Sequence, residues 1–141
     1  MDMKKLKVYL SVPMVTNRSL GRAKLMAEVI EKEGHELTSP WVLGRIGRER
    51  SAGLDVFKRD ESGAESCDVL VSDVSEPSIG VGMEIMAAHK AGRQIILVVK
   101  SGNITSRMLM HMQPKTVVEF DDDDSLVRGL EDALRRAVTL K

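Results

Sequence analysis

Five short apolar runs lie along the chain, separated by longer segments in which apolar positions recur every three to four residues. The runs are rich in Val, Ile and Leu, and the one at 94–99 contains the uninterrupted stretch Ile-Ile-Leu-Val-Val. A run this apolar is typical of a strand that is buried on both faces of a parallel sheet. The pattern therefore predicts strands at 6–12, 36–38, 69–74, 94–99 and 116–120.

The intervening segments predict five helices, because their apolar residues keep helical spacing and several of them end at a glycine or proline. The helices are expected at 19–33, 54–66, 80–91, 105–112 and 126–140. Strands that alternate with helices favour an α/β fold, here a three-layer sandwich around a five-stranded parallel sheet. With the first strand in the middle, a flavodoxin-like (Rossmann-like) strand order is the simplest arrangement. We expect one domain over residues 1–141, with a glycine-rich insertion at 44–53.

The composition narrows the functional classes. The 21 basic and 21 acidic residues cancel, and the chain has only one Trp, one Tyr and two Phe, so no nucleic-acid partner is expected. No segment reaches the roughly 20 apolar residues that cross a bilayer, and the first residues lack the features of a signal peptide. We therefore expect no membrane partner and a cytoplasmic location. Cys67 is the single cysteine, which excludes an internal disulfide and indicates a small buried apolar side chain.

Four consecutive aspartates, Asp121–Asp124, precede the last predicted helix. Such a run fits either a metal site or the capping of a helix N-terminus. Its position immediately before a helix favours capping.

The stretch 67–85 joins the third predicted strand to a helix that opens with Gly80 and Gly82. In open α/β sheets, ligands bind beyond the carboxyl ends of the strands, and a helix N-terminus there attracts anions. We place Glu84 in the first turn of this helix, where the helix dipole favours an ionised carboxylate. Position alone also fits a surface glutamate that complements the dipole.

The loops that follow parallel strands share one edge of the sheet, so side chains distant in sequence are expected to converge there. The polar, aromatic and glycine residues that this edge brings together are Tyr9, Pro13, Asn17, Arg18, Trp41, Asp60, Ser78, Gly80 and Glu84.

Three segments carry a family resemblance: Lys-Val-Tyr-Leu-Ser at 7–11, Phe-Lys-Arg-Asp at 57–60, and the stretch 67–84. Together they resemble the nucleoside 2-deoxyribosyltransferase superfamily over nearly the whole chain. The run Pro-Ser-Ile-Gly-Val-Gly-Met-Glu at 77–84 is similar to that of the 2′-deoxynucleoside 5′-phosphate N-hydrolases. The resemblance implies a glycosidase that needs no metal or cofactor, because a carboxylate stabilises the positive charge that develops on the sugar.

The resemblance also implies roles for three residues. Glu84 would attack the sugar C1′ and form a glycosyl ester, Tyr9 would orient the Glu84 carboxylate, and Asp60 would contact the sugar or base and protonate the departing base. Without the resemblance, Tyr9 also fits a half-buried aromatic at a strand end, and Asp60 a solvated helix residue.

Ser78 distinguishes two branches of the superfamily. The nucleoside transferases typically have Asp six residues before the nucleophile, whereas the phosphate-accepting hydrolases have Ser, which does not repel a phosphate dianion. The resemblance thus implies a nucleotide substrate. The residues it places around that substrate are Val12, Pro13, Met14, Asn17, Arg18, Trp41, Ser78, Gly80, Gly82, Ser106, Arg107 and Met108.

The family further implies a homodimer, in which Ser106–Met108 of one subunit reaches the phosphate in the other. Two alternatives stay open. The Ser-Val-Pro run at 11–13 leans toward the transferases, which exchange bases through the same intermediate. If Glu84 is only structural, the chain is a non-catalytic nucleotide-binding module.

Overall fold

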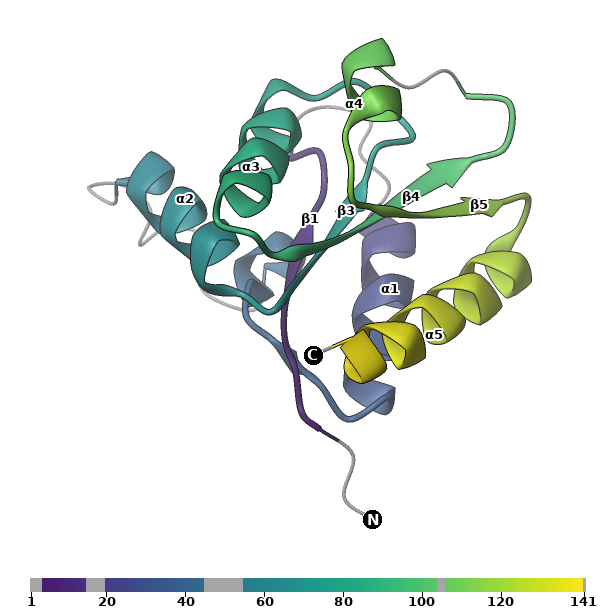
Figure 1. Cartoon of the computed structure of the whole chain (residues 1–141). Helices are drawn as coiled ribbons and strands as arrows, with labels where there is room; N and C mark the ends of the chain where they lie inside the picture. The colour runs from purple at the N-terminus through teal and green to yellow at the C-terminus, as the bar shows by residue number, and fades with distance from the viewer. Residues whose placement is uncertain (1–3, 15–19, 45–54, 104–105, 141) are drawn as a thin grey trace.

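The computed structural model describes residues 4–14, 20–44, 55–103 and 106–140. Its centre is a sheet of five strands in the order β2-β1-β3-β4-β5 (Figure 1). The strands are β1 (Lys7–Ser11), β2 (Glu36–Leu37), β3 (Val69–Asp73), β4 (Gln94–Lys100) and β5 (Thr116–Phe120). Every neighbouring pair is parallel. The expected α/β sandwich with a five-stranded parallel sheet and flavodoxin-like order is confirmed.

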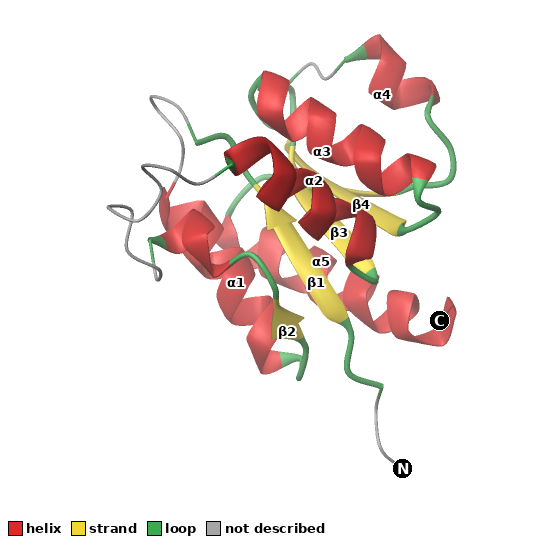
Figure 2. Cartoon of the chain, turned by 90° about the vertical axis from the view of Figure 1, so that its left-hand side faces the viewer, coloured by secondary structure: helices red, strands yellow, loops and turns green. Residues whose placement is uncertain are grey.

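Helices cover both faces of the sheet (Figures 1 and 2). They are α1 (Leu20–Lys32), α2 (Val56–Ser66), α3 (Ile79–Lys90), α4 (Arg107–His111) and α5 (Asp123–Leu140), together with a short 3-10 helix, η1 (Pro40–Leu43). Helices α1 and α5 pack on one face, and α2 and α3 pack side by side on the other. Each face has its own apolar core.

The alternation of side chains along β1 decides which residues face α3. Val8, Leu10 and Val12 belong to the core beneath α1 and α5. Tyr9 belongs to the opposite core, and Ser11, two residues later, shares its face. In the register with β3, Ser11 lies beside Ser72. The carboxyl end of the sheet is therefore polar on the face that α3 covers.

Several helix starts differ by one to three residues from the sequence prediction, and a side-chain cap explains two of them. The last helix begins at Asp123, not at 126, because the Asp122 carboxylate accepts a hydrogen bond from the Ser125 N–H at 2.8 Å and Asp123 and Asp124 form the first turn. The capping interpretation of the aspartate run is thus confirmed. Helix α2 begins at Val56 after Asp55, which accepts from the Lys58 N–H at 2.9 Å.

The side of α3 that packs on the sheet is aliphatic. Val81, Ile85 and Ala88 are the residues that α3 buries, whereas Met83 and Met86 are 53% and 38% exposed. The branched aliphatic residues pack on the sheet, and the helical spacing then turns the methionines outward.

None of the helices in the described ranges is long and apolar enough to cross a membrane. In the same part of the chain, no three His, Cys, Asp or Glu side chains gather closely enough to hold a metal ion.

Candidate active site

Glu84 lies in the second turn of α3, not in the first as the sequence predicted. Ser78 is the N-cap and Ile79 the first helical residue, so the Glu84 side chain leaves the helix past its N-terminal amides. It points to β1, where both carboxylate oxygens are held. The Tyr9 hydroxyl donates to Oε2, and the Ser11 hydroxyl donates to Oε1 at 2.8 Å.

Burial sets the ionisation of this carboxyl group. It raises the pKa of Glu84 to about 7, against the lowering effect of the hydrogen bonds from Tyr9 and Ser11. The nearby Asp60 carboxylate raises the pKa further, and the Arg59 guanidinium lowers it. Desolvation therefore outweighs the hydrogen bonds that favour the ionised form of Glu84.

Tyr9 is fully buried in the middle of β1, so it is neither half-buried nor at the strand end. Burial, followed by the neighbouring Glu84 charge, raises the pKa of Tyr9, and the hydroxyl keeps the proton that it donates. Gly63 on α2 makes room for the ring, since a Cβ there would lie 2.5 Å from Tyr9 Cε2. Trp41 of η1 meets the ring edge to face, with centroids 6.0 Å apart.

Asp60 lies on α2 near this group, held by its neighbour Arg59. The Arg59 Nε donates to Asp60 Oδ1 at 2.7 Å, and both side chains are about a quarter exposed, at 24% and 26%. The Arg59 guanidinium also stacks over the Trp41 ring, 4.3 Å from its centroid. Trp41, Asp60 and Arg59 thus form a partly open polar and aromatic wall beside Tyr9 and Glu84.

Ser78 caps α3 in a way that leaves its own hydrogen available. Its Oγ accepts from the Val81 N–H at 3.3 Å, so the hydroxyl can still donate to an anion. Gly80 and Gly82 follow on the exposed side of the first turns, and a Cβ at either would meet nothing within 4 Å. The tip of α3 therefore offers open space and donors for a phosphate.

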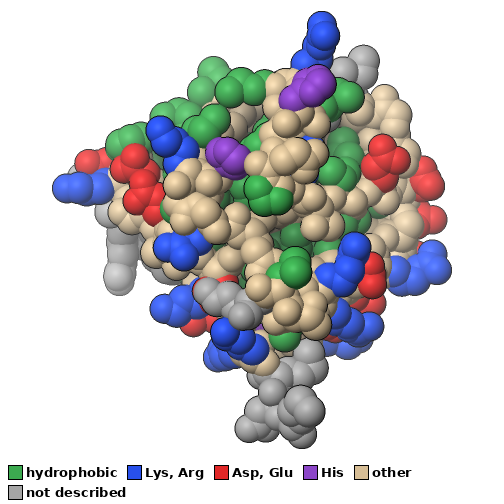
Figure 3. Space-filling view, viewed as in Figure 1, with side chains coloured by type: hydrophobic (Ala, Val, Ile, Leu, Met, Phe, Trp, Pro, Cys, Tyr) green, Lys and Arg blue, Asp and Glu red, His purple; other side chains and the backbone are tan. Residues whose placement is uncertain are grey.

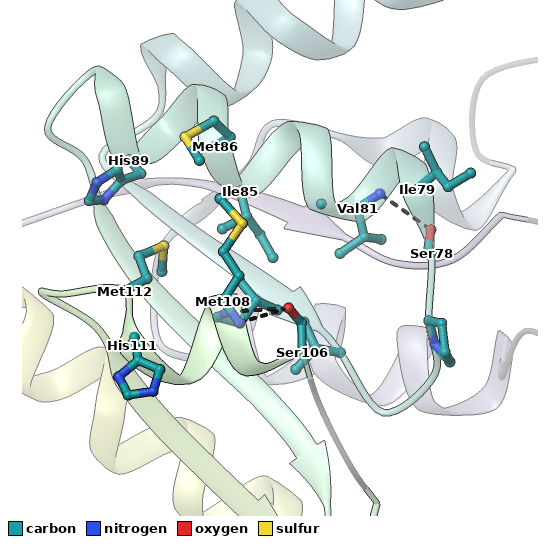
Figure 4. A pocket seen from close by; sticks show the side chains of 14 residues that line it. Ser78, Ile79, Val81, Ile85, Met86, His89, Ser106, Met108, His111 and Met112 are labelled. Atoms are coloured by element: carbon teal, nitrogen blue, oxygen red, sulfur yellow. Dashed lines mark hydrogen bonds between the residues drawn. The ribbon is translucent and has the colours of Figure 1, made fainter.

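A groove of about 790 Å³ runs between α3 and α4 on the side of α3 away from β1. Figure 4 shows Met86 and His89 of α3 facing Met108, His111 and Met112 across it. Ser78 and Ser106 line one end, and Ser106 caps α4 by accepting from the Met108 N–H at 3.1 Å. Hydrophobic side chains gather over these two helices on the surface (Figure 3).

The expectation that all site residues face one cleft does not hold for this groove. Its lining includes Ser78, Gly82, Ser106 and Met108, but not Tyr9, Trp41, Asp60 or Glu84. Helix α3 separates the two groups, and Ser78 lies at its N-terminal tip. From there to Glu84 the helix rises by roughly 9 Å.

The other predicted contacts have varied positions. The Val12 side chain packs into the core beneath α1 and α5, so, contrary to the prediction of a substrate contact, it does not face the site. Pro13 is buried and Met14 is 41% exposed. Arg107 is exposed at the start of α4. Asn17 and Arg18 lie outside the described residues.

Sequence reasoning missed Ser11, Arg59 and Gly63 as parts of the site. The signal for Ser11 was present, since it stands two residues after Tyr9 on a strand and so shares its face. Gly63 carried no recognisable signal, because a glycine inside a helix has no single meaning.

No family model matches the chain, but individual proteins do. A protein of Thermofilum pendens named "Putative 2′-deoxynucleoside 5′-phosphate N-hydrolase 1" is 29% identical over 144 residues, covering 96% of this chain and all of that protein. A protein of the same name from Methanococcoides burtonii is 29% identical over 110 residues, which is 74% of this chain and 89% of the relative. The 5-hydroxymethyl-dUMP N-hydrolase of Mus musculus is 37% identical over 65 residues, 43% of this chain and 38% of the mouse protein.

Among solved structures, the CMP N-glycosidase of Clostridium botulinum has the same fold. Its TM-score is 0.65 at 18% identity, with 89% of this chain and 98% of that chain covered. The match to the Thermofilum pendens protein covers that protein over its whole length. The chain is therefore homologous to the 2′-deoxynucleoside 5′-phosphate N-hydrolases.

Proposed function

We propose that this protein hydrolyses the N-glycosidic bond of 2′-deoxynucleoside 5′-monophosphates, releasing the free base and 2-deoxyribose 5-phosphate. The observation that carries the proposal is the Glu84 carboxylate, which is partly buried against β1 with Tyr9 on one oxygen and Ser11 on the other. Homology to nucleotide N-hydrolases supplies the substrate class. We assign the activity to the cytoplasm, where nucleotides are metabolised.

The reaction proceeds in two displacements at the sugar C1′. A Glu84 oxygen attacks C1′, the bond from C1′ to the base nitrogen breaks, and its electron pair leaves with the base, which gains a proton. Water then attacks C1′ from the face that the base has left, the ester bond to Glu84 breaks, and a proton is lost. The configuration at C1′ is retained.

Two neighbouring side chains assist. Tyr9 remains protonated and orients the Glu84 carboxylate by its hydrogen bond. Asp60, across from Glu84 on α2, contacts the sugar or base and delivers a proton to the departing base. Arg59 engages Oδ1 of Asp60, so Oδ2 is the oxygen that we assign to that task.

We place the 5′-phosphate at the tip of α3, against Ser78 and the adjacent amides. The capping geometry leaves the Ser78 hydroxyl able to donate, and open space surrounds Gly80 and Gly82. The sugar then extends from this tip toward Glu84.

A base-exchanging transferase is the alternative that the Pro13 loop favours. It shares the Glu84 ester and differs in the acceptor, which is a second base in place of water. A non-catalytic nucleotide-binding module is the second alternative, and it requires that Glu84 be only structural.

Product analysis separates the three. The protein is incubated with each 2′-deoxynucleoside 5′-monophosphate and with the matching nucleoside, with and without a second free base. Base release from monophosphates without an acceptor is the expected result. Exchange that requires an acceptor and favours nucleosides would establish the transferase, and binding without turnover would establish the nucleotide-binding module.

We further propose that the protein acts as a homodimer joined at the groove between α3 and α4. The groove is largely apolar, and Met108 on its rim is 70% exposed in the single chain. An exposed apolar surface of this kind is typical of a surface that a partner covers. In this arrangement Ser106 and Arg107 of one subunit reach the phosphate in the other.

The oligomeric state tests the dimer. Met108→Glu is expected to convert a dimer into a monomer in light scattering after gel filtration. Met110→Glu is the matched control, because Met110 is 58% exposed on the same helix but does not line the groove. A monomeric wild-type protein with full activity, or equal effects of the two variants, would contradict the arrangement.

A further inference from the structure

We infer that Ser11 is a positioning residue for Glu84, which sets the orientation and ionisation of the carboxylate from the side opposite to Tyr9. The inference rests on the proposed function, in which Glu84 is the nucleophile. It assigns a role to a residue that carries none in the family resemblance.

The geometry is set by the end of β1. Ser11 is the last residue of the strand, is 1% exposed, and points to the same face as Tyr9. Its hydroxyl donates to Oε1 of Glu84 at 2.8 Å, while the Tyr9 hydroxyl donates to Oε2. Two donors on two different oxygens fix the plane of the carboxylate. Each oxygen still has a second acceptor position, so one remains free to attack.

Ser72 shows that a serine can be buried on this face of the sheet without a hydrogen bond to Glu84. It is the register partner of Ser11 on β3 and is fully buried. Nevertheless, its hydroxyl has no hydrogen-bond partner among the described residues. Ser11, by contrast, directs its proton to the one oxygen that Tyr9 leaves open. The two serines differ in what they touch and not in where they are buried.

The Ser11 hydrogen bond also affects ionisation, since it stabilises the charged form of Glu84. The other charged or titratable groups that face Glu84 are Tyr9 on β1 and Asp60 and Arg59 on α2. With a Glu84 pKa of about 7, loss of one hydrogen bond to a charged group raises that pKa by about one unit. The ionised fraction at pH 7 then falls from about half to about a tenth, whereas at pH 9 nearly all of it is ionised in both proteins.

The test compares Ser11→Ala with Ser72→Ala, which removes the same atom from the same face of the neighbouring strand. Ser11→Ala is expected to lower kcat/KM about five-fold at pH 7 and to approach wild type at pH 9, with the acid limb moved up by about one pH unit. Ser72→Ala is expected to follow the wild-type profile. Equal losses at every pH for Ser11→Ala, or the same profile for both variants, would overturn the inference.

A second measurement does not depend on turnover. The side-chain carboxyl carbons of the glutamates are labelled with ¹³C, and the Glu84 signal is identified by its loss in Glu84→Gln. Its NMR titration midpoint is expected to rise in Ser11→Ala and to stay unchanged in Ser72→Ala. If the protein cleaves no nucleotide but this shift occurs, the proposed function fails while the contact between Ser11 and Glu84 stands; an unshifted midpoint overturns the inference.

Discussion

Replacing Glu84 by Gln should stabilise the fold at neutral pH while it abolishes the proposed activity. The substitution keeps the shape of the side chain and removes its ability to ionise. It also exchanges one of the two oxygens that accept from Tyr9 and Ser11 for an NH2 donor, but the cost of that exchange does not vary with pH. In the wild-type protein Glu84 is partly buried, and its pKa of about 7 lies well above the ordinary value of 4.5. Ionising Glu84 therefore destabilises the folded protein, and the glutamine variant is spared this destabilisation.

The sign and size of the effect follow from proton linkage. Between pH 4.5 and 7 the folded state binds more protons at Glu84 than the unfolded state does, so the contribution of Glu84 to stability is complete below about pH 4.5 and is lost as the pH rises through 7. Each pKa unit corresponds to about 1.4 kcal/mol, which gives a total of about 3 kcal/mol. His35, whose pKa burial lowers, acts in the opposite direction, but it is present in both proteins and cancels in the comparison.

The assay is urea unfolding of wild type and Glu84→Gln at several pH values from 4 to 9. The free energy of unfolding of the variant relative to wild type should increase from pH 4.5 and level off above pH 7. The final gain of about 3 kcal/mol corresponds to a shift of roughly 1–3 M in the urea midpoint. A difference that does not change with pH would refute the reasoning, because it would mean that Glu84 has an ordinary pKa and is hydrated.

Two further substitutions test the surroundings of Glu84. Gly63→Ala places a Cβ 2.5 Å from the Tyr9 ring and is expected to lower kcat at least ten-fold by displacing the Tyr9 hydroxyl. The control is Gly21→Ala, whose Cβ meets nothing within 4 Å and which is expected to leave kcat unchanged and to add about 0.5–1 kcal/mol of stability. Steady-state kinetics and thermal unfolding are measured for both variants, and equal kcat values would exclude this role of Gly63. Ser78→Asp retains a residue that caps helices well but adds a negative charge, so kcat/KM should fall for monophosphates and be spared for nucleosides; parallel losses on both substrates would contradict a phosphate site at Ser78.

The sheet could be predicted from the sequence because burial on both faces leaves a simple signature. The run at 94–99 has no polar residue between Ile95 and Val99, and it forms β4. The strand order followed from the alternation of strands and helices together with right-handed crossovers. Helix starts were less predictable, as at α5, because they depend on one hydrogen bond from a side chain such as Asp122.

The candidate site was predicted only in outline. The motif at 77–84 located Glu84 and Ser78, and the hydrogen bond between Tyr9 and Glu84 is present. The environment of Glu84 was not predictable, because its pKa depends on desolvation by elements that are distant in sequence. Gly63 was missed for the same reason, since its importance lies in a contact with Tyr9 on another element.

The separation of the α3–α4 groove from Glu84 is also a tertiary property. The sequence alone indicates only that these residues lie at the same edge of the sheet. The burial of Val81, Ile85 and Ala88 fixes the rotation of the helix, and this rotation directs Glu84 to β1 and the methionines to α4. Moving the buried face of a helix by one residue rotates the helix by about 100°, which is enough to change the element that a side chain meets.

The central claim is that Glu84 forms a covalent bond to the sugar. The direct test is intact-protein and peptide mass spectrometry after incubation with a 2-fluorinated 2′-deoxynucleoside 5′-monophosphate, which carries the fluorine on C2′ of the sugar, where it slows hydrolysis of the ester by destabilising positive charge at C1′. We expect one fluorosugar phosphate per chain, located on the peptide that contains Glu84 and absent in Glu84→Gln. Attachment to another residue, or cleavage of the natural substrate by Glu84→Gln at the wild-type rate, would contradict the account.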